Sequence, residues 1–144
     1  MHNWFLSKVT YEKMLENGFQ KKVTEQYLVD ALSFTEAEAR TIEEIKPFIT
    51  GEFTVSAVGR ARLSESFLGE GDRYYKAKLN FITLDEKSGQ EKKTAVYVLV
   101  QADNFEQSLK KLNEGMKGTI SDYEIVSITE TAILDVFEWN NNID

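Results

Sequence analysis

Two pairs of adjacent lysines are the residues whose type and spacing best fit a binding chemistry. They stand at equivalent places, each shortly after a glycine-containing turn signal. Ammonium groups hold phosphate by charge and hydrogen bonds, and nearby aromatic or guanidinium planes stack on a base. We therefore expect a small phosphorylated or nucleotide-type ligand to be bound. The candidate ligand-binding residues are Lys21, Lys22, Lys92, Lys93, Arg60, Arg62 and Tyr74.

A purely structural interpretation of the same residues stays open. Lysines beside hairpin turns keep strand edges soluble and block pairing between molecules. Tyrosines at alternating strand positions are ordinary residues of a sheet. The sequence alone does not decide between solubilising lysines and a ligand site.

A catalytic constellation is missing from the sequence. There is no cysteine, and the single histidine, His2, stands at a terminus, where we expect fraying. The acidic pairs Glu43-Glu44 and Asp85-Glu86 fit solvated positions on a helix and in a turn. The glycine-bearing run from Gly69 to Asp72 lacks the lysine of a nucleotide-binding loop. We expect a non-enzymatic protein without a metal site or a cofactor.

Charge is distributed unevenly along the chain, whose formal net charge is −7. No lysine or arginine follows Lys117, whereas six acidic residues do, so the preceding body is nearly neutral. An acidic protein is a poor general binder of nucleic acid, so a nucleic-acid partner is disfavoured. No run of apolar residues is long enough to span a membrane, and no signal peptide is visible, so we expect a cytoplasmic protein.

The elements that must position the lysines occur twice. Gly18, Lys21 and Phe34 recur as Gly89, Lys92 and Phe105, at a spacing of 71 residues. Before the hairpin and after the helix the spacing is 70, and such one-residue changes fall where loops are expected. The pattern favours a divergent tandem duplication. Chance similarity of two αβ segments is the alternative.

Each copy predicts two strands, a helix and a long strand. The first helix is expected to start at Thr35, with a capping box to Glu38, and to end near Lys46, before the only proline. A periodic apolar stripe predicts the second helix. The stripes are Ile42, Ile45 and Ile49 in the first copy, and Phe105, Leu109, Leu112 and Met116 in the second. The long strands are Phe53–Phe67 and Tyr123–Phe137, which we expect to be bent or bulged.

These elements predict an α+β fold. It would be a pseudo-twofold repeat of two ββαβ units, with a largely antiparallel sheet and two helices packed on it. The strands flanking each helix should be parallel; the first strand can lie between them, but the sequence does not fix the strand order. We expect a single domain over 1–144, with units at 3–67 and 74–137 and a polar acidic tail at 138–144.

Three runs of the sequence resemble an uncharacterised family of small bacterial and phage proteins, a domain of unknown function. The runs are Tyr27–Arg40, Phe81–Gly89 and Gly115–Thr119. The resemblance covers nearly the whole chain and implies a stand-alone cytosolic protein of bacterial or phage origin. It carries no family-level activity and no catalytic residue.

The leading hypothesis is a cytosolic binding protein that holds or sequesters a phosphorylated ligand, in the manner of a phage anti-defence sponge. Three alternatives remain: a protein–protein module using the acidic C-terminal segment, a nucleic-acid accessory protein, and an enzyme using carboxylates and lysines. We also expect a homo-oligomer, because open sheet edges can pair between subunits.

Overall fold

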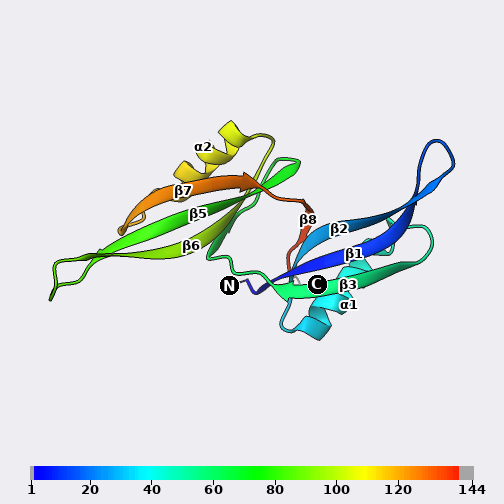
Figure 1. Ribbon diagram of the computed structural model, residues 1–144, viewed down its shortest axis with the longest axis horizontal. Helices are drawn as coiled ribbons and strands as arrows, with labels where there is room; N and C mark the ends of the chain where they lie inside the picture. The colour runs from blue at the N-terminus through cyan, green and yellow to red at the C-terminus, as the bar shows by residue number, and fades with distance from the viewer. Residues whose placement is uncertain (1, 140–144) are drawn as a thin grey trace, which may run out of the picture. The chain divides into compact units, whose positions relative to one another are not determined.

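The structure is a computed structural model and describes residues 2–139. It divides into two compact units, which we call unit 1 (residues 1–61 and 132–144) and unit 2 (residues 62–131). Within residues 2–139 each unit has one four-stranded sheet and one helix (Figure 1). The α+β class predicted from the sequence is confirmed, with two sheets in place of one.

Unit 1 is built from four strands and helix α1. Its sheet has the order β3-β1-β2-β8, in which β1 runs antiparallel to both neighbours. The strands that flank α1 are therefore parallel, as the sequence predicted, and the structure fixes the order that the sequence left open, with β1 between them. The elements are β1 (Trp4–Met14), β2 (Gln20–Asp30), α1 (Phe34–Ile45), β3 (Phe53–Arg60) and β8 (Ile133–Phe137).

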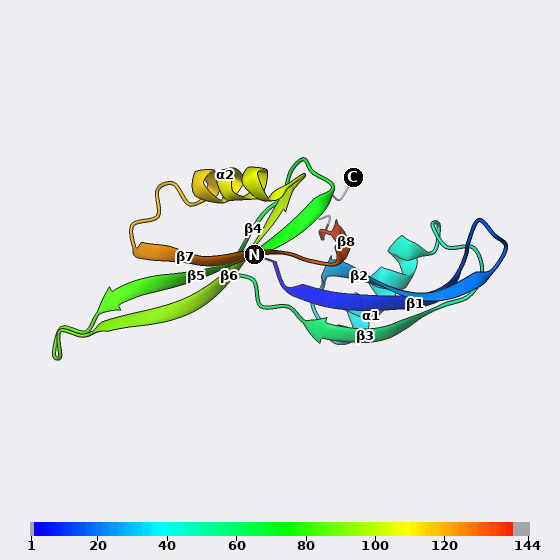
Figure 2. The same ribbon diagram turned by 45° about the horizontal axis from the view of Figure 1, so that its top comes forward.

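Unit 2 has the equivalent arrangement, with strand order β4-β6-β5-β7 and helix α2 on one face of the sheet (Figure 2). A register shift interrupts β5–β7 between Lys78 and Leu79, and the matching shift in β1–β3 lies between Lys8 and Val9. The elements are β4 (Glu65–Phe67), β5 (Arg73–Leu84), β6 (Glu91–Ala102), α2 (Phe105–Gly115) and β7 (Asp122–Glu130). These equivalences support the proposed duplication.

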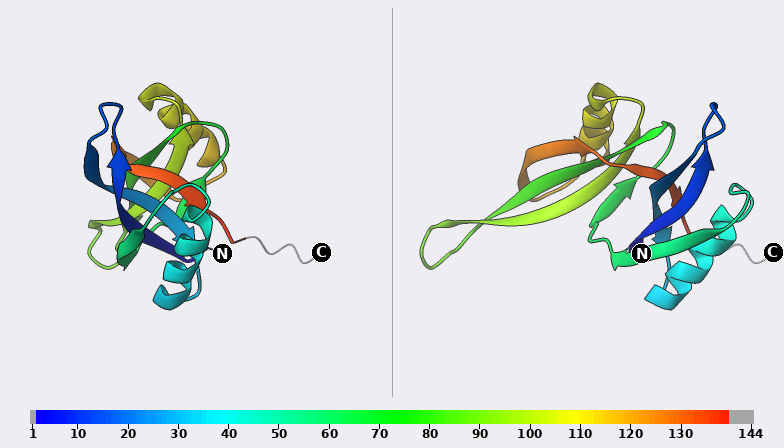
Figure 3. Two further views of the ribbon diagram at one scale, coloured as in Figure 1. Left: turned by 90° about the vertical axis from the view of Figure 1, so that its right-hand side faces the viewer. Right: turned by 45° about the vertical axis from the view of Figure 1, so that its right-hand side comes forward.

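The last strand of each sequence repeat lies in the unit that is formed mainly by the other repeat. We call these two strands, β4 and β8, the exchanged strands. β4 follows β3 in the chain but pairs with β6, and β8 follows β7 but pairs with β2 (Figure 3). Phe67 lies beside Val100, and Phe137 lies beside Val29. The predicted long strands Phe53–Phe67 and Tyr123–Phe137 are therefore each two strands. As a result, the compact units differ from the ranges 3–67 and 74–137 in their last strands.

Backbone hydrogen bonds explain where the long segments break. The Ala61 N–H donates to the Trp4 carbonyl at 2.9 Å, and the Thr131 N–H donates to the Tyr74 carbonyl at 2.8 Å. Each bond closes the pairing with the first strand of that copy. Beyond each bond the chain leaves this sheet and forms a strand of the other sheet.

Both helices begin at a polar residue one step before the first helical position. Ser33 caps α1 by accepting from the Glu36 N–H, and Asn104 caps α2 by accepting from the Gln107 N–H. The predicted cap at Thr35 was wrong, because Ser33 already occupies an extended conformation suited to that role. The predicted end near Lys46 is confirmed, since Lys46 is the C-cap.

The cores consist of the helix stripe and the sheet residues beneath it. In unit 2, Leu112 and Met116 pack on Ala77, Leu79 and Val98. In unit 1, the buried residues of α1 are Ala37, Thr41 and Ile45, whereas Ile42 is 40% exposed. The stripe predicted for the first helix was therefore displaced by one position at Ile42, because Thr41 faces the sheet in its place.

Candidate functional site

The face of the unit 1 sheet that α1 leaves uncovered carries a shallow polar hollow of about 550 Å³. Val9 packs on Ile45 of α1, so the neighbouring Thr10 points to the opposite face of β1. The hollow is lined by Thr10, Tyr11, Glu12, Lys22, Thr24, Glu52, Phe53, Thr54 and Ser56.

Hydroxyl groups from three adjacent strands meet in this hollow. The Thr10 Oγ1 lies 3.0 Å from Thr24 Oγ1 of β2 and donates to Ser56 Oγ of β3 at 3.0 Å. The Ser56 hydroxyl in turn donates to the Lys8 carbonyl at 3.2 Å. Ser56 reaches this face because the register shift opposite Lys8 and Val9 displaces β3. The result is a row of groups that can both donate and accept.

Lys22 adds a cation to the hydroxyl row. It is exposed, lies beside Glu12 in the β1–β2 register, and has no ion pair within residues 2–139. Glu12 and Glu52 supply carboxylates to the same hollow. The hollow can therefore bind an anionic group at Lys22 and accept hydrogen bonds from hydroxyl or amino groups of the same ligand.

In unit 2 the equivalent lysine is already bound by a carboxylate of the same unit. Lys93, the counterpart of Lys22, donates to Glu124 Oε1 at 2.9 Å, and Asn80 donates to the same oxygen at 3.3 Å. The hydrogen bond from Lys93 lowers the pKa of Glu124, and the carboxylate raises the pKa of Lys93. The two lysine pairs are thus equivalent in sequence but not in chemistry.

The other predicted site residues lie in different surroundings. Lys21 and Lys92 are exposed near the starts of β2 and β6, and Arg62 is exposed in the connector after Ala61. The structure brings Lys21 and Lys22 together on one hairpin, and Lys92 and Lys93 together on the hairpin of the other unit.

Arg60 and Tyr74 are engaged inside their own units. Arg60 donates to Asn3 Oδ1 at 3.1 Å and its guanidinium carbon lies 5.3 Å from the centroid of the Phe5 ring. Tyr74 is only 5% exposed, and its carbonyl accepts from the Thr131 N–H and hydroxyl. Their contacts favour structural roles.

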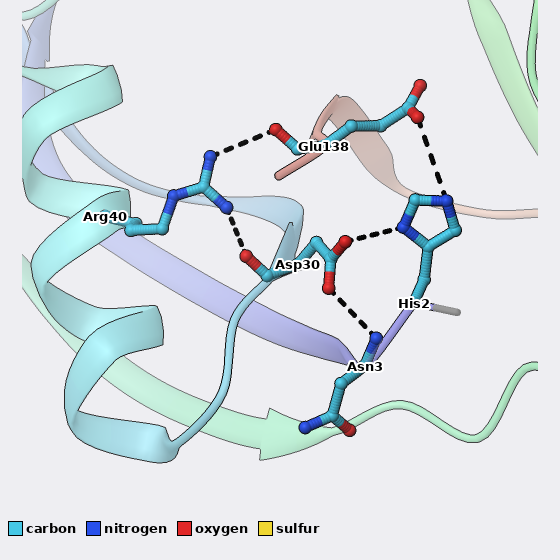
Figure 4. Close-up of polar contacts among 5 residues, drawn as sticks. All are labelled: His2, Asn3, Asp30, Arg40 and Glu138. Atoms are coloured by element: carbon cyan, nitrogen blue, oxygen red, sulfur yellow. Dashed lines mark hydrogen bonds and ion pairs between the residues drawn. The ribbon is translucent and has the colours of Figure 1, made fainter. Parts of the chain in front are cut away.

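A second polar cluster surrounds Asp30 at the end of β2 (Figure 4). His2 is ordered against it rather than frayed, with Nδ1 2.5 Å from Asp30 Oδ2 and Nε2 3.9 Å from Glu138 Oε2. The Asn3 N–H donates to Asp30 Oδ1 at 2.9 Å. Burial alone would raise the pKa of Asp30, but the hydrogen bonds from His2 and Asn3 hold it below its usual value.

Arg40 of α1 joins this cluster to the end of the exchanged strand. Its guanidinium donates to the Asp30 carbonyl and to the Glu138 carbonyl, the latter at 3.1 Å, and lies 5.2 Å from the centroid of the Trp139 ring. The sticks in Figure 4 show Arg40 reaching from the helix to both carbonyls. His2 and Asp30 could orient a proton, but these contacts chiefly hold the segment after β8. We call Arg40 and its two carbonyls the unit 1 clasp.

Comparison with known proteins identifies the family. A family model described as Domain of unknown function (DUF4494) matches residues 3–139. The chain belongs to this family. The DUF4494 match includes both copies and both exchanged strands, and it confirms the resemblance to a domain of unknown function. No curated protein and no solved structure matches the chain. Within residues 2–139, neither helix has the length and apolar character needed to cross a membrane.

Sequence reasoning missed the hydroxyl row of this DUF4494 protein and the role of His2. Thr10, Thr24 and Thr54 look like ordinary strand residues, because threonine suits a half-buried sheet. Only the strand register brings them together, and the displacement that adds Ser56 has no local signal. The contact between His2 and Asp30 was missed because the spacing of these two residues matches no sequence motif.

Proposed function

We propose that the protein is a non-enzymatic binding protein that holds a small ligand in the hollow of unit 1. The ligand carries an anionic group, which Lys22 binds, together with hydroxyl or amino groups that hydrogen-bond the threonine row, Glu12 and Glu52. A nucleotide is one member of this class, since it combines a phosphate with a ribose and a base. Sequestration of such a ligand would fit the sponge-like role expected from the sequence.

One observation carries this proposal. At two equivalent places, unit 2 neutralises its lysine with Glu124, whereas in unit 1 Lys22 makes no ion pair with any of the residues that the structure describes and lies beside an open row of hydroxyl groups. A lysine that only kept a hairpin soluble would not need that row. A lysine that is not held in an ion pair, beside prearranged donors and acceptors, suits recognition of a polar anion.

The charges in the hollow restrict the class of ligand further. Lys22 is opposed by Glu12 and Glu52, so a bare anion such as inorganic phosphate meets one cation and two carboxylates. A ligand that offers donors to those carboxylates avoids the repulsion. We therefore expect a nucleotide to bind more tightly than either inorganic phosphate or the corresponding nucleoside.

The test compares these three probes on one protein. Thermal-shift and calorimetric titrations with a panel of mono- and dinucleotides, the matching nucleosides and inorganic phosphate measure which class binds. At least one nucleotide should bind, and Lys22→Ala should remove that binding. Lys93→Ala is the matched control and should leave it intact. Equal loss in both variants, or no binding by any nucleotide, would remove the basis for this site.

A further inference from the structure

We propose that unit 2 carries a docking site for a tryptophan side chain of a partner peptide. The site is an open hollow of about 480 Å³, lined by the segment from Phe67 to Glu70 and by Lys111, Glu114 and Gly115 of α2. Its volume lies within the range of about 300–1,000 Å³ that is usual for ligand sites. Every lining residue belongs to unit 2, so the proposal is independent of the ligand site in unit 1.

The equivalent place in unit 1 is taken by Trp139. Gly69 and Trp139 correspond at the spacing of 70 residues, and Gln101 and Asp30 correspond at the spacing of 71. The Gly69 N–H donates to Gln101 Oε1 at 2.9 Å. In the same way the Trp139 N–H donates to the carboxylate of Asp30. The backbone positions of Gly69 and Trp139 are therefore equivalent in the structure as well as in the sequence.

Only the side chain differs between these two positions. In unit 1 the centroid of the Trp139 ring lies 5.2 Å from the guanidinium carbon of Arg40. In unit 2 Lys111 takes the place of Arg40, but Gly69 has no side chain, and a Cβ added there would meet no atom within 4 Å. The hollow therefore corresponds to the space that an indole ring occupies in unit 1. An indole supplied by another molecule would lie beside Lys111, as Trp139 lies beside Arg40.

The charges around the hollow favour a basic peptide as the source of the indole. Glu70 and Glu114 line the hollow, and neither makes an ion pair with a residue between positions 2 and 139. The Lys111 ammonium donates instead to the carbonyls of Gln101, at 3.0 Å, and Glu70. Basic residues on either side of a tryptophan would pair with the two carboxylates. Tryptophan is also among the residues that most often dominate binding when they fill such a pocket.

Two-dimensional NMR of the chain with short peptides tests the proposal. The probe is acetyl-Lys-Trp-Lys-amide, which should shift the amide signals of Gly69 and Gly115 in a saturable way. The matched peptide acetyl-Lys-Ala-Lys-amide should leave both signals unchanged, and acetyl-Glu-Trp-Glu-amide should bind more weakly than the probe. Equal shifts with the alanine peptide, or no shift of either glycine with the probe, would overturn the proposal. Free indole that binds as tightly as the probe would overturn the assignment to a peptide.

A substitution that fills the hollow tests the place of binding. Gly69→Trp gives unit 2 the side chain that unit 1 has, and it should weaken binding of the probe by about tenfold or more. Gly69→Ser adds a side chain too small to fill the hollow and should bind as the wild type does. Both new side chains start in open space, so both variants should fold, as thermal unfolding will check. Undiminished binding by folded Gly69→Trp protein would refute the site.

Discussion

Arg40 and Lys111 occupy equivalent places on the two helices and make equivalent contacts. Arg40 donates to the carbonyls of Asp30 and Glu138, and Lys111 donates to those of Gln101, at 3.0 Å, and Glu70. In each unit one carbonyl belongs to the strand before the helix and the other to the segment after the exchanged strand. Each helix therefore fastens a strand contributed by the other copy.

Lys111 and the carbonyls of Gln101 and Glu70 form the clasp of unit 2, and its loss should weaken β4. Lys111→Ala leaves two carbonyls without their donor, and we expect a loss of about 1–3 kcal/mol in the free energy of unfolding. Hydrogen exchange of the amides of residues 65–70 should accelerate more than that of β5. Lys110→Ala, which removes the exposed neighbouring ammonium, is the control and should change neither quantity appreciably. Equal effects of the two substitutions would contradict the clasp.

Gly115 should not tolerate alanine. Its added methyl group would lie 2.6–2.7 Å from three atoms of the Phe67 ring, so one of the two must move. We expect Gly115→Ala to cost about 1–3 kcal/mol in chemical denaturation, as overpacking does. Phe67→Leu in the same chain should restore part of the loss. Gly59→Ala has open space around the added methyl group and should be nearly neutral.

Asp30 should contribute stability that depends on pH. Its pKa is lowered in the folded protein, so the contribution is present above the usual aspartate range and is lost as the pH falls through the folded value. We expect Asp30→Asn to be less stable than the wild type near neutral pH, with a difference that shrinks on acidification. Urea unfolding across this range measures it. A constant difference at every pH would exclude an ionised Asp30 as the cause.

A buried hydroxyl pair should be replaceable only as a pair. The Thr41 hydroxyl lies 2.8 Å from Ser7 Oγ and 2.7 Å from the Ala37 carbonyl, and both residues are fully buried. Thr41→Val alone leaves Ser7 without its partner, at a cost of about 1–3 kcal/mol. The equivalent pair in unit 2 is apolar, Ala77 with Leu112. Ser7→Ala combined with Thr41→Leu should therefore recover stability relative to Thr41→Val, as thermal unfolding will show.

Local patterns were sufficient for much of the fold. The Asn17-Gly18 and Ser88-Gly89 signals mark the two hairpin turns, and the position of Pro47 predicts the end of α1 at Lys46. These features depend on backbone preferences within a few residues. The α+β class and the parallel strands around each helix follow from them together with chain handedness.

The sequence did not predict which strands pair over long distances along the chain. Phe53–Phe67 contains the composition of two strands but no signal for which sheet receives the second. The choice depends on the Phe67–Gly115 contact and on Lys111, residues that lie far along the chain. For the candidate site, the sequence identified the lysines as candidates. The neutralisation of Lys93 by Glu124 could not be predicted, because it arises only from the β5–β7 register.

The place of β8 at the end of the strand sequence sets the order in which the two sheets are completed during synthesis. Unit 2 has all its strands once Glu130 has left the ribosome, whereas the unit 1 sheet waits for Phe137, although its other strands were made first. Gln26 must find Ile133 across nearly the whole chain, and such distant pairings form slowly. A nascent chain from which Glu130 but not Ile133 has emerged should therefore carry a finished unit 2 and a unit 1 whose β2 edge is still unpaired.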